Sequence, residues 1–438
     1  MLESSSGSDS LSVLVFDPSF LLTALPQRKE IEVQDRLNAT GTSLFESSDT
    51  LRTLEQMVRS FRSREASFRF MGGAVGYISY DAAKQWIFGR KEDDGNRRNF
   101  ATIFPDMQFG IYEEGIIFDH NLRKFFYFFS DRVKDRSKEI EEICSVDSNG
   151  NTIGRLAFSK PETNVSKEEF QEKVRKAKDH IRNGDIFQVV LSRKYKFNTS
   201  GDMLQFYSEL KRINPSPYMY FLDMCETKIV GSSPEMLVRV NGGIVETYPI
   251  AGTRPSSLDE SENSKLAREL LLDQKERAEH VMLVDLARND IGRVSEFGSV
   301  SVGEFMQVHR YSHVQHIVSH VTGKLRRNLT AFDAMRSLFP AGTVSGAPKI
   351  RALEIIEELE TEARGPYAGA VGYFSFNGNM DSAITIRTLV SKGNEAFIQT
   401  GAGIVADSEP EAEWFETERK AAALLRALEL SSEEISKN

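Results

Sequence analysis

The chain has 438 residues, with 55 lysines and arginines against 64 aspartates and glutamates, for a formal net charge of −9. Charges of both signs are spread along the chain, so no basic stripe indicates a nucleic-acid partner, and the acidic balance disfavours anionic membranes. No apolar run reaches membrane-spanning length, the Ser-rich start lacks signal-peptide features, and the 2 cysteines have no metal or redox spacing. We expect a soluble, cytoplasmic protein.

The first third of the chain has the pattern of a β-rich region. Residues 1–10 are polar and predicted to be disordered. Residues 11–130 alternate short apolar runs with turn signals, and runs such as Arg69–Tyr80 are typical of strands. Residues 131–165 are highly charged and then rich in Asp, Ser, Asn and Gly, which predicts a helix, a loop and the best candidate for a domain boundary.

The rest of the chain mixes helix and hairpin signals. Ser166–Glu169 is a capping box that opens a helix, and Ile186–Tyr195 follows as a strand. Asn241–Gly243 and Asn377–Gly378 are hairpin signals between β-forming runs. The long predicted helices cover about 262–290, 347–363 and 411–428.

These elements predict an α+β fold of two packed, mainly antiparallel β-sheets flanked by helices. We divide it into a disordered 1–10, an N-terminal region 11–150 packed closely on the rest, and a core 160–432. The pentapeptide Gly73–Tyr77 recurs as Gly369–Tyr373, which suggests similar strands in the two sheets, each needing close backbone approach.

The most informative segment lies near the C-terminus. The strand-like run Glu395–Thr400 leads into Gly401–Gly403, a predicted turn whose glycines would let the backbone approach an anion. On the following helix, Glu413, Glu416 and Lys420 share one face. An anion-binding loop beside carboxylates suits a carboxylate ligand bridged to the protein by Mg²⁺.

A dinucleotide-binding motif is the competing interpretation of this segment. Gly401–Ala406 fits the loose G-x-G-x-x-A pattern. That motif requires a helix directly after the glycines and a parallel βαβ unit. Here Asp407–Pro410 intervenes and the preceding strands have hairpin character, so the dinucleotide interpretation is disfavoured.

A second acidic helix carries Glu276 and Glu279 on one face. Alone, this pattern is typical of a solvated, charged helix. Together with Glu416 and its neighbours, it supplies what a metal site assembled between two helices would need.

The histidines at 309, 313, 316 and 320 would line one face of a helix, as in a zinc site. The segment 314–322 is β-branched and favours a strand, which would separate them. An acid–base role for one of these histidines is the better prediction.

Two further segments are polar in a way that suits anions. Thr343 and Ser345 precede a helix start at Pro348, a pattern that fits either an anion site or a simple N-cap. Arg387 lies in the otherwise apolar predicted strand 383–388 and could pair with a ligand carboxylate or be an ordinary edge-strand arginine.

Taken together, these motifs resemble the chorismate-utilising enzymes, most closely the anthranilate synthase component I branch, over nearly the whole chain. The segments that carry the resemblance are Gly184–Ser192, Asn214–Met219, Ser232–Glu235, Pro249–Thr253, Lys275–Asp290, His316–Ser319, Gly342–Pro348 and Gly401–Lys420. The family's two-sheet fold agrees with the hairpin pattern. The resemblance implies Mg²⁺-dependent conversion of chorismate and ammonia to anthranilate and pyruvate, the first committed step of tryptophan biosynthesis.

The resemblance also implies roles for individual residues. Glu235 would protonate the departing ring hydroxyl, which requires a raised pKa, and His316 would assist the loss of pyruvate. Glu279 and Glu416 would hold Mg²⁺, with Glu276 and Glu413 behind them or as alternate ligands. The implied catalytic residues are Glu235, His316, Thr343 and Gln188, and the implied substrate-binding residues are Thr253, Tyr373, Arg387, Gly401, Ala402, Gly403 and Lys420.

Two positions discriminate between branches of the family. Relatives that add water to chorismate carry a lysine base where this chain has Gln188, and a neutral amide cannot deprotonate water. Many aminodeoxychorismate synthases carry a nucleophilic lysine where this chain has Ala251. Both differences favour anthranilate as the product.

A third part of the resemblance concerns regulation. Leu44–Ser47 is similar to the family's Leu-Leu-Glu-Ser segment, which forms a tryptophan feedback site with Asn-Pro-x-Pro-Tyr-Met and would make residues 11–150 regulatory. The implied inhibitor-binding residues are Glu46, Ser47, Pro215, Tyr218 and Met219. The alternative is an ordinary loop that caps the N-terminal sheet.

The chain has no recognisable glutaminase, because Cys144 and Cys225 lie in contexts unlike a reactive cysteine. A separate glutaminase subunit is therefore expected to supply ammonia, in a hetero-oligomer. The alternatives are aminodeoxychorismate synthase component I, an enzyme that stops at the aminated ring, and a non-catalytic regulator that binds chorismate or tryptophan. The presence of the implied acid, base and metal residues favours catalysis.

Overall fold

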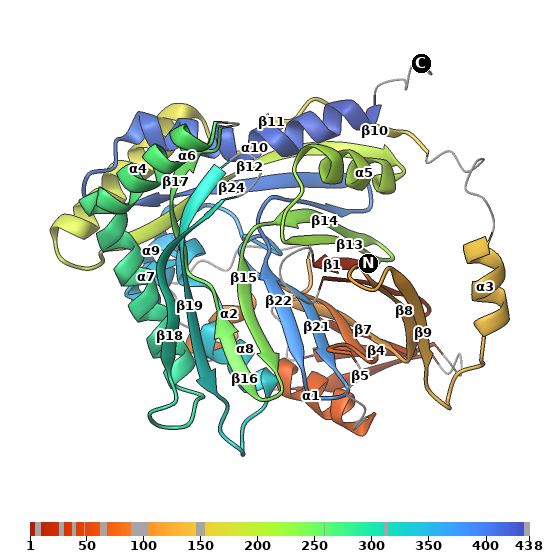
Figure 1. Ribbon diagram of the computed structural model, residues 1–438. Helices are drawn as coiled ribbons and strands as arrows, with labels where there is room; N and C mark the ends of the chain where they lie inside the picture. The colour runs from red at the N-terminus through yellow and green to blue at the C-terminus, as the bar shows by residue number, and fades with distance from the viewer. Residues whose placement is uncertain are drawn as a thin grey trace.

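The computed structural model describes residues 1–4, 10–25, 30–36, 41–47, 49–61, 68–88, 104–145, 154–257, 259–310 and 314–432. Across these ranges the chain forms two large β-sheets packed together, with helices around them (Figure 1). The long strand pairs in both sheets are antiparallel. The predicted α+β fold is confirmed.

The first sheet contains both the first strand and the last strand of the described chain. Its order is β10 (Leu156–Phe158), β12 (Gln188–Gly201), β24 (Glu395–Ile404), β23 (Thr388–Lys392), β14 (Thr227–Ser233), β13 (Tyr218–Met224), β1 (Leu2–Ser4), β2 (Leu11–Val15), β8 (Glu114–Asp119) and β9 (Lys124–Phe129). The short strands β11 (Glu162–Thr163) and β20 (Gly346–Ala347) pair with β12.

The second sheet lies against the first. Its order is β17 (Ile250–Pro255), β19 (Val314–Lys324), β16 (Ile244–Thr247), β15 (Met236–Asn241), β22 (Met380–Ile384), β21 (Ala370–Ser375), β6 (Gly73–Ile78), β7 (Met107–Tyr112), β3 (Phe20–Ala24), β4 (Glu30–Asp35) and β5 (Gly41–Glu46). Strand β18 (Ser301–Arg310) pairs with β19.

The helices are α1 (Thr50–Ser60), α2 (Ala82–Phe88), α3 (Ser137–Ser145), α4 (Lys167–Arg182), α5 (Met203–Ile213), α6 (Glu260–Leu272), α7 (Gln274–Gly292), α8 (Ala331–Leu338), the 3₁₀ helix η1 (Gly342–Val344), α9 (Lys349–Leu359) and α10 (Pro410–Ser432). All the helices except α3 lie on or beside the sheets, and α3 stands apart from them (Figure 1). Helices α10 and α5 lie along the first sheet at the top of Figure 1. None of the described helices is long and apolar enough to cross a membrane.

The two copies of the repeated pentapeptide lie side by side in one sheet. Strands β6 and β21 pair antiparallel at the centre of the second sheet, with Gly76 opposite Gly372. A Cβ at Gly76 would lie 2.0 Å from the carbonyl oxygen of Gln108, and one at Gly372 would lie 2.1 Å from that of Asp381. The predicted close approach is therefore correct, but the prediction of one copy in each sheet is wrong.

The N-terminal region is woven into both sheets. Residues Leu2–Ser4 form β1, which pairs with β13, so these residues are not disordered as predicted; residues 5–9 lie outside the described ranges. Strands of the region 11–150 form one edge of the first sheet and also one edge of the second sheet. The predicted boundary near 131–165 coincides with α3, which buries no side chain, but it does not separate two sheets.

Helix predictions in the core are close to the observed helices. The capping box is present, since Ser166 Oγ accepts from Glu169 N at 3.2 Å and Glu169 Oε2 accepts from Ser166 N at 2.8 Å. The single helix predicted over 262–290 is instead two helices, α6 and α7. Asp273 ends the first and caps the second, because its side chain accepts hydrogen bonds from the first N–H groups of α7.

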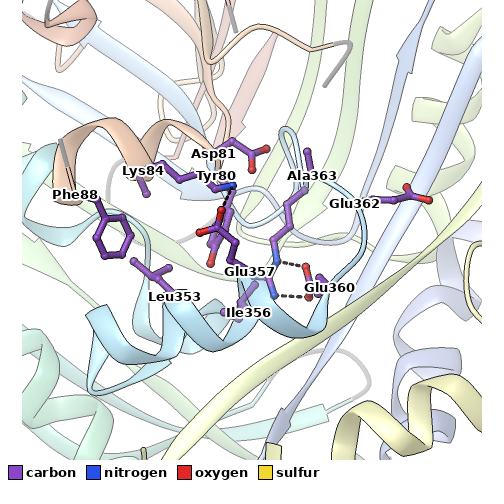
Figure 2. Close-up of a pocket in the computed structure, with 12 residues that line it drawn as sticks. Tyr80, Asp81, Lys84, Phe88, Leu353, Ile356, Glu357, Glu360, Glu362 and Ala363 are labelled. Atoms are coloured by element: carbon purple, nitrogen blue, oxygen red, sulfur yellow. Dashed lines mark hydrogen bonds and ion pairs between the residues drawn. The ribbon is translucent and has the colours of Figure 1, made fainter. Parts of the chain in front are cut away.

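A polar junction joins α2 of the N-terminal region to α9 of the core (Figure 2). Lys84 of α2 lies 3.1 Å from Glu357 of α9. Arg364, after α9, is buried and forms two hydrogen bonds to Glu360, at 2.8 and 2.7 Å. A buried guanidinium that binds both oxygens of one carboxylate fixes the end of α9.

Candidate active site

The predicted catalytic, substrate and metal residues come from ends and edges of many elements. The structure places Gln188 at the start of β12, Glu235 between β14 and β15, Thr253 on β17, Glu276 and Glu279 on α7, His316 on β19, Thr343 in η1, Arg387 between β22 and β23, Gly401, Ala402 and Gly403 on β24, and Glu413, Glu416 and Lys420 on α10. Hydrogen bonds and charge interactions link most of these side chains into one site.

The glycines of β24 make room for side chains from neighbouring elements. Gly401–Gly403 is not a turn, as predicted, but part of β24, which pairs with β12 as far as Ile404. A Cβ at Gly403 would lie 2.7 Å from Gln188 Nε2, and one at Gly401 would lie 2.7 Å from the hydroxyl of Tyr367. The lack of a Cβ at these glycines lets Gln188 and Tyr367 approach the backbone.

Carboxylates of α7 and α10 converge beside Gln188. The Gln188 amide donates a hydrogen bond of 3.0 Å to Glu279 Oε1. Burial raises the pKa of Glu279, the hydrogen bond from Gln188 opposes this rise, and the charges of Glu276 and Glu416 add to it. Burial also raises the pKa of Glu413, with a contribution from Glu416. Crowded, half-buried carboxylates of this kind favour a cation between them.

Lys420 is the cation that meets this cluster within the protein. Its Nζ lies 2.8 Å from Glu416 Oε1 and donates a 2.9 Å hydrogen bond to the carbonyl oxygen of Gly401. Burial acts to raise the pKa of Glu416, but Lys420 and more distant arginines, including Arg387, lower it. Within the described ranges, no three histidine, cysteine or acidic side chains come together as a metal site. Glu279 and Glu416 could hold a Mg²⁺ ion that takes its other ligands from substrate and water.

Arg387 has a different backbone setting from the one predicted. It lies in the link between β22 and β23 rather than in a strand, with φ of 52°, in the left-handed region that non-glycine residues rarely adopt. Its carbonyl oxygen accepts a 3.1 Å hydrogen bond from Ser232 N. Burial lowers the pKa of Arg387, while Tyr367 and Glu416 act to raise it. Strained backbone of this kind is typical of functional sites.

The tyrosine beside Arg387 is Tyr367, and not Tyr373 as predicted. Tyr367 is buried, and the charge of Arg387 influences its pKa. Tyr373 instead packs edge-on against Phe70, with ring centres 4.9 Å apart, in a separate cavity. Tyr367 lies in the turn before β21, whereas Tyr373 lies within the strand and lines the separate cavity, so belonging to the same sequence segment does not decide which tyrosine meets Arg387.

Glu235 has the electrostatic character of a general acid. Burial raises the pKa of Glu235 to about 7, and Thr343 and Lys420 both act to lower it. The Thr343 hydroxyl lies beside this carboxyl without forming a well-aligned hydrogen bond. A carboxyl group with this pKa is partly protonated at neutral pH and can donate a proton to a leaving group.

His316 is held in a defined orientation. Its Nδ1 lies 2.7 Å from the carbonyl oxygen of Gly252 and 3.1 Å from Thr253 Oγ1. A carbonyl oxygen can only accept, so Nδ1 carries the proton and Nε2 is the basic nitrogen of the neutral ring. Burial lowers the pKa of His316, the Gly252 bond opposes this, and the charge of Arg387 lowers it further. His316 is therefore a neutral base near Arg387.

Among the residues that the structure describes, the other histidines do not form a metal site. His309 on β18 is the strand partner of His316, and His320 lies further along β19, as the strand interpretation predicted. His313 lies outside the described residues. The dinucleotide motif is also absent in structural terms, because β24 continues through the glycines and α10 begins only at Pro410.

A second cavity lies between the two sheets, away from the acidic cluster. It is partly open to solvent and is lined mainly by apolar and aromatic side chains. Its lining residues include Leu2, Val13, Arg69, Phe70, Tyr218, Met219, Tyr220, Val371, Tyr373, Asp381 and Ala383. Such a cavity, apolar with a few polar groups at one side, suits a small amphipathic ligand.

The predicted inhibitor-binding residues are only partly brought together. Tyr218 and Met219 line the second cavity, whereas Glu46, Ser47 and Pro215 are not among its lining residues. Glu46 ends the exposed strand β5, and the Ser47 hydroxyl lies 2.9 Å from Thr53 Oγ1 at the start of α1. The sequence analysis missed Asp381 and β1, which reach the cavity through strand pairing.

Comparisons with known proteins agree over nearly the whole chain. The family model described as chorismate binding enzyme matches residues 17–426. Anthranilate synthase component 1 of Methanothermobacter marburgensis is 47% identical over 434 residues, which cover 99% of this chain and 90% of that protein. The corresponding protein of Aquifex aeolicus is 44% identical, with coverage of 99% and 90%.

The structural comparison gives the same result. The crystal structure of anthranilate synthase component I from Streptococcus pneumoniae matches with a TM-score of 0.83 and 38% identity, covering 96% of this chain and 93% of that one. The similarity in structure therefore extends over nearly the whole chain.

Proposed function

Because the chain belongs to the chorismate-binding enzymes, we propose that it is the aminating component of an anthranilate synthase. It would act as a lyase that converts chorismate and ammonia to anthranilate and pyruvate, at the start of tryptophan biosynthesis. The observation that carries this proposal is the buried Glu235, a carboxyl with a pKa of about 7, in one site with the neutral base His316 and the neutral amide Gln188.

The acid and the base divide the reaction between them. In the amination, ammonia forms the new C–N bond while the ring C–O bond breaks, and Glu235 supplies the proton with which the hydroxyl leaves as water. In the elimination, the enolpyruvyl group leaves as pyruvate, and His316 Nε2 accepts the proton that the ring loses. The bond from Nδ1 to the Gly252 carbonyl oxygen, 2.7 Å, keeps Nε2 directed at this task.

The side chain at position 188 supports ammonia as the nucleophile. Gln188 is 4% exposed and its amide nitrogen donates to Glu279. An amide nitrogen is not basic, so Gln188 cannot take a proton from water. Ala251, on β17, offers no side-chain nucleophile to attack the ring. Gln188 therefore disfavours the addition of water and Ala251 disfavours attack by a side-chain amine, and amination by free ammonia is compatible with both residues.

We assign the divalent metal to Glu279 and Glu416, with Glu276 and Glu413 behind them. The mutual charge effects among these carboxylates support a cation at this place. When bound, Mg²⁺ would neutralise and orient the ring carboxylate of the substrate. Arg387, Tyr367 and Lys420 would bind the substrate's anionic groups, and Thr253 and Thr343 would line its pocket.

Ammonia would come from a separate glutaminase subunit. The names of the similar proteins, component 1, imply a second component. Cys144 and Cys225 are both free and exposed, and a glutaminase would need a reactive cysteine activated by a neighbouring base. The active enzyme would then be a hetero-oligomer that passes ammonia from the partner to this chain.

Tryptophan is the ligand that we propose for the second cavity. Its apolar and aromatic walls suit an indole ring, and Asp381 supplies a carboxylate for the ammonium group of an amino acid. Binding there would inhibit the enzyme from outside the substrate site. This assignment replaces Glu46 and Ser47 with residues of β1, β21 and β22.

Product identification tests the catalytic proposal. Purified chain would be incubated with chorismate, Mg²⁺ and an ammonium salt at mildly alkaline pH, and the products identified by mass spectrometry. Anthranilate and pyruvate, lost on addition of EDTA, are expected. Aminodeoxychorismate would contradict the assignment from Ala251, and isochorismate or salicylate would contradict that from Gln188.

A further inference from the structure

A series of hydrogen-bonded, largely buried polar side chains begins at the second cavity. Asp381 and Tyr218 line the cavity, and the Tyr218 hydroxyl donates to Asp381 Oδ1 at 3.0 Å. Arg239, on β15, donates from Nε to Asp381 Oδ2 at 3.0 Å and from Nη2 to the Tyr218 hydroxyl at 3.1 Å. One guanidinium therefore holds two of the polar groups of the cavity wall.

The same guanidinium reaches in the opposite direction. Arg239 Nη1 donates to Glu246 Oε1, on β16, at 3.3 Å. The other oxygen, Oε2, lies 2.8 Å from His320 Nε2 on β19. The His320 ring stacks on Tyr248, with centres 4.3 Å apart and planes within 4° of parallel. Arg239 and Glu246 thus connect the cavity wall to β19.

This series of hydrogen-bonded side chains ends near two parts of the candidate active site. His320 lies on the same face of β19 as His316, since the two are separated by an even number of strand residues. Tyr248 lines a small cavity that also contacts Glu235 and Thr343. The strand β22 makes a parallel link, because it carries Asp381 at one end while Ile384 N donates to the Glu235 carbonyl oxygen at 3.0 Å.

The burial of these groups makes their charges interdependent. The side chains of Arg239, Glu246 and Asp381 are 14%, 16% and 7% exposed. Burial acts to lower the pKa of Arg239, but the neighbouring Asp381, Tyr218 and Glu246 raise it overall. Arg239 is a buried cation shared between two carboxylates. If its contact with one carboxylate weakens, either its contact with the other strengthens or a buried charge is left unpaired.

A ligand in the second cavity would disturb this arrangement directly. The ammonium group of an amino acid would approach Asp381, which already binds Arg239 and lies 3.6 Å from Arg69 Nη1. Competition for Asp381 would shift Arg239 toward Glu246, and the change would pass to His320 and Tyr248. The energy difference between the two arrangements is the physical basis of coupling between sites.

We propose that Arg239 and Glu246 couple the second cavity to the active site, so that tryptophan bound at Asp381 alters the hold of His320 and Tyr248 on the elements beside His316 and Glu235. This inference rests on the proposed tryptophan site. Arg239 and Glu246 are positioning residues, because neither lies in the candidate active site, and their effect on turnover without tryptophan is expected to be small.

If these hydrogen-bonded side chains have a purely structural role, a different result is expected. If Glu246 only neutralises a buried arginine, its replacement would lower the melting temperature and leave the coupling between ligands as it was. If the relay operates, the replacement would reduce the coupling and leave tryptophan binding by itself nearly unchanged. The ratio of two dissociation constants separates these cases, because a general loss of stability does not alter it.

The test measures that ratio in the full chain by isothermal titration. Tryptophan is titrated with Mg²⁺ present and ammonia and glutamine absent, once without chorismate and once with it at saturation. The factor by which chorismate weakens tryptophan binding is compared between the parent, Glu246→Gln and a matched control, Glu304→Gln. Glu304 also pairs with a histidine, His309, at 3.3 Å, but at the exposed strand β18.

We expect Glu246→Gln to reduce the coupling factor about tenfold, or to abolish a smaller one, with tryptophan binding alone changed less than about twofold, while Glu304→Gln behaves as the parent. His320→Asn breaks the next link and should give the same loss, which covers the case in which Glu246→Gln does not fold. An unchanged factor in either folded variant would overturn the relay alone. Absence of tryptophan binding in the parent would overturn the proposed inhibitor site, and the relay with it.

Discussion

The candidate active site and the second cavity both adjoin strand β22, yet the chain builds them differently. Active-site residues lie at the ends of core elements, inside segments such as Ser232–Glu235 and Gly342–Pro348 that are distinctive in the sequence. The second cavity is made where β1, β13, β21 and β22 come together, with Arg69 and Phe70 beside them. No single segment encodes it.

The two regions also differ in their electrostatics. The active site contains buried carboxyls with raised pKa values and a neutral histidine, which are the properties of an acid–base and metal site. The second cavity is mainly apolar, with its charges paired at one wall. Substitutions in the first region should therefore alter chemistry, and those in the second should alter inhibition.

The largest expected effect comes from Glu235→Gln. An amide cannot donate the proton that the departing hydroxyl requires, so anthranilate formation should fall by a factor of about 10²–10⁴. The appearance of anthranilate fluorescence would measure the loss. Because the buried carboxyl is costly to ionise near pH 7, the variant should melt at a temperature no lower than that of the parent.

A matched substitution at an exposed acid controls for this variant. Glu296→Gln, which removes only a surface contact to Lys324, should leave the rate unchanged. If Glu235→Gln retained more than about a tenth of the parent rate, another group would have to be the acid, and the assignment from pKa and burial would be wrong.

The next effect concerns the metal. Glu279→Gln removes a proposed ligand and should weaken Mg²⁺ binding, measured by titration calorimetry with chorismate present and ammonia absent, by about 10–100-fold or more. Glu276→Gln should weaken it less, because Glu276 lies behind the site and also binds Arg254, at 3.4 Å. Equal effects of the two substitutions, or no effect of either, would contradict the assignment of α7 ligands.

A pair of tyrosine substitutions distinguishes the two regions directly. Tyr367→Phe should raise the KM for chorismate, and Tyr373→Phe should weaken inhibition by tryptophan, each by up to about tenfold, the scale of one lost hydrogen bond to a charged group. Each variant serves as the control for the other. If Tyr373→Phe raised the KM for chorismate instead, Tyr373 would belong to the substrate site, as the sequence predicts. Its position in the second cavity would then not explain its function.

The success of the sequence analysis follows the same division. The fold class, the acidic helices, Gln188, Glu235 and His316 could be predicted because each lies in a local pattern that is present in the sequence itself. Asp273, which divides the predicted helix 262–290, was missed because its capping role depends on one side-chain conformation.

What could not be predicted depends on register and on pairing between distant segments. Tyr373 and Tyr367 are six residues apart in the chain, and it is the folded turn before β21 that brings Tyr367, and not Tyr373, to Arg387. The pairing of β1 with β13 joins residues more than 200 positions apart, and a short polar segment gives no local sign of it. The strand through Gly401–Gly403 was taken for a turn because its long partner, β12, lies far away in sequence.

The smallest effect that we predict is a displacement of the pH profile. The kcat/KM for chorismate, corrected for the concentration of free ammonia, should fall as pH rises through about 7, because Glu235 must be protonated to act as the acid. Its raised pKa places the active form below this pH and the inactive form above it. The rising limb at lower pH should reflect loss of the proton from His316, whose pKa lies below its usual value.

Thr343→Val tests the origin of the falling limb. The Thr343 hydroxyl acts to lower the pKa of Glu235, so its removal should raise that pKa and move the falling limb to higher pH, by less than about one unit. The rising limb should stay in place, since Thr343 is not among the groups that influence His316. Movement of both limbs together would indicate a general change in the site, whereas an unmoved falling limb would show that a group other than Glu235 sets it.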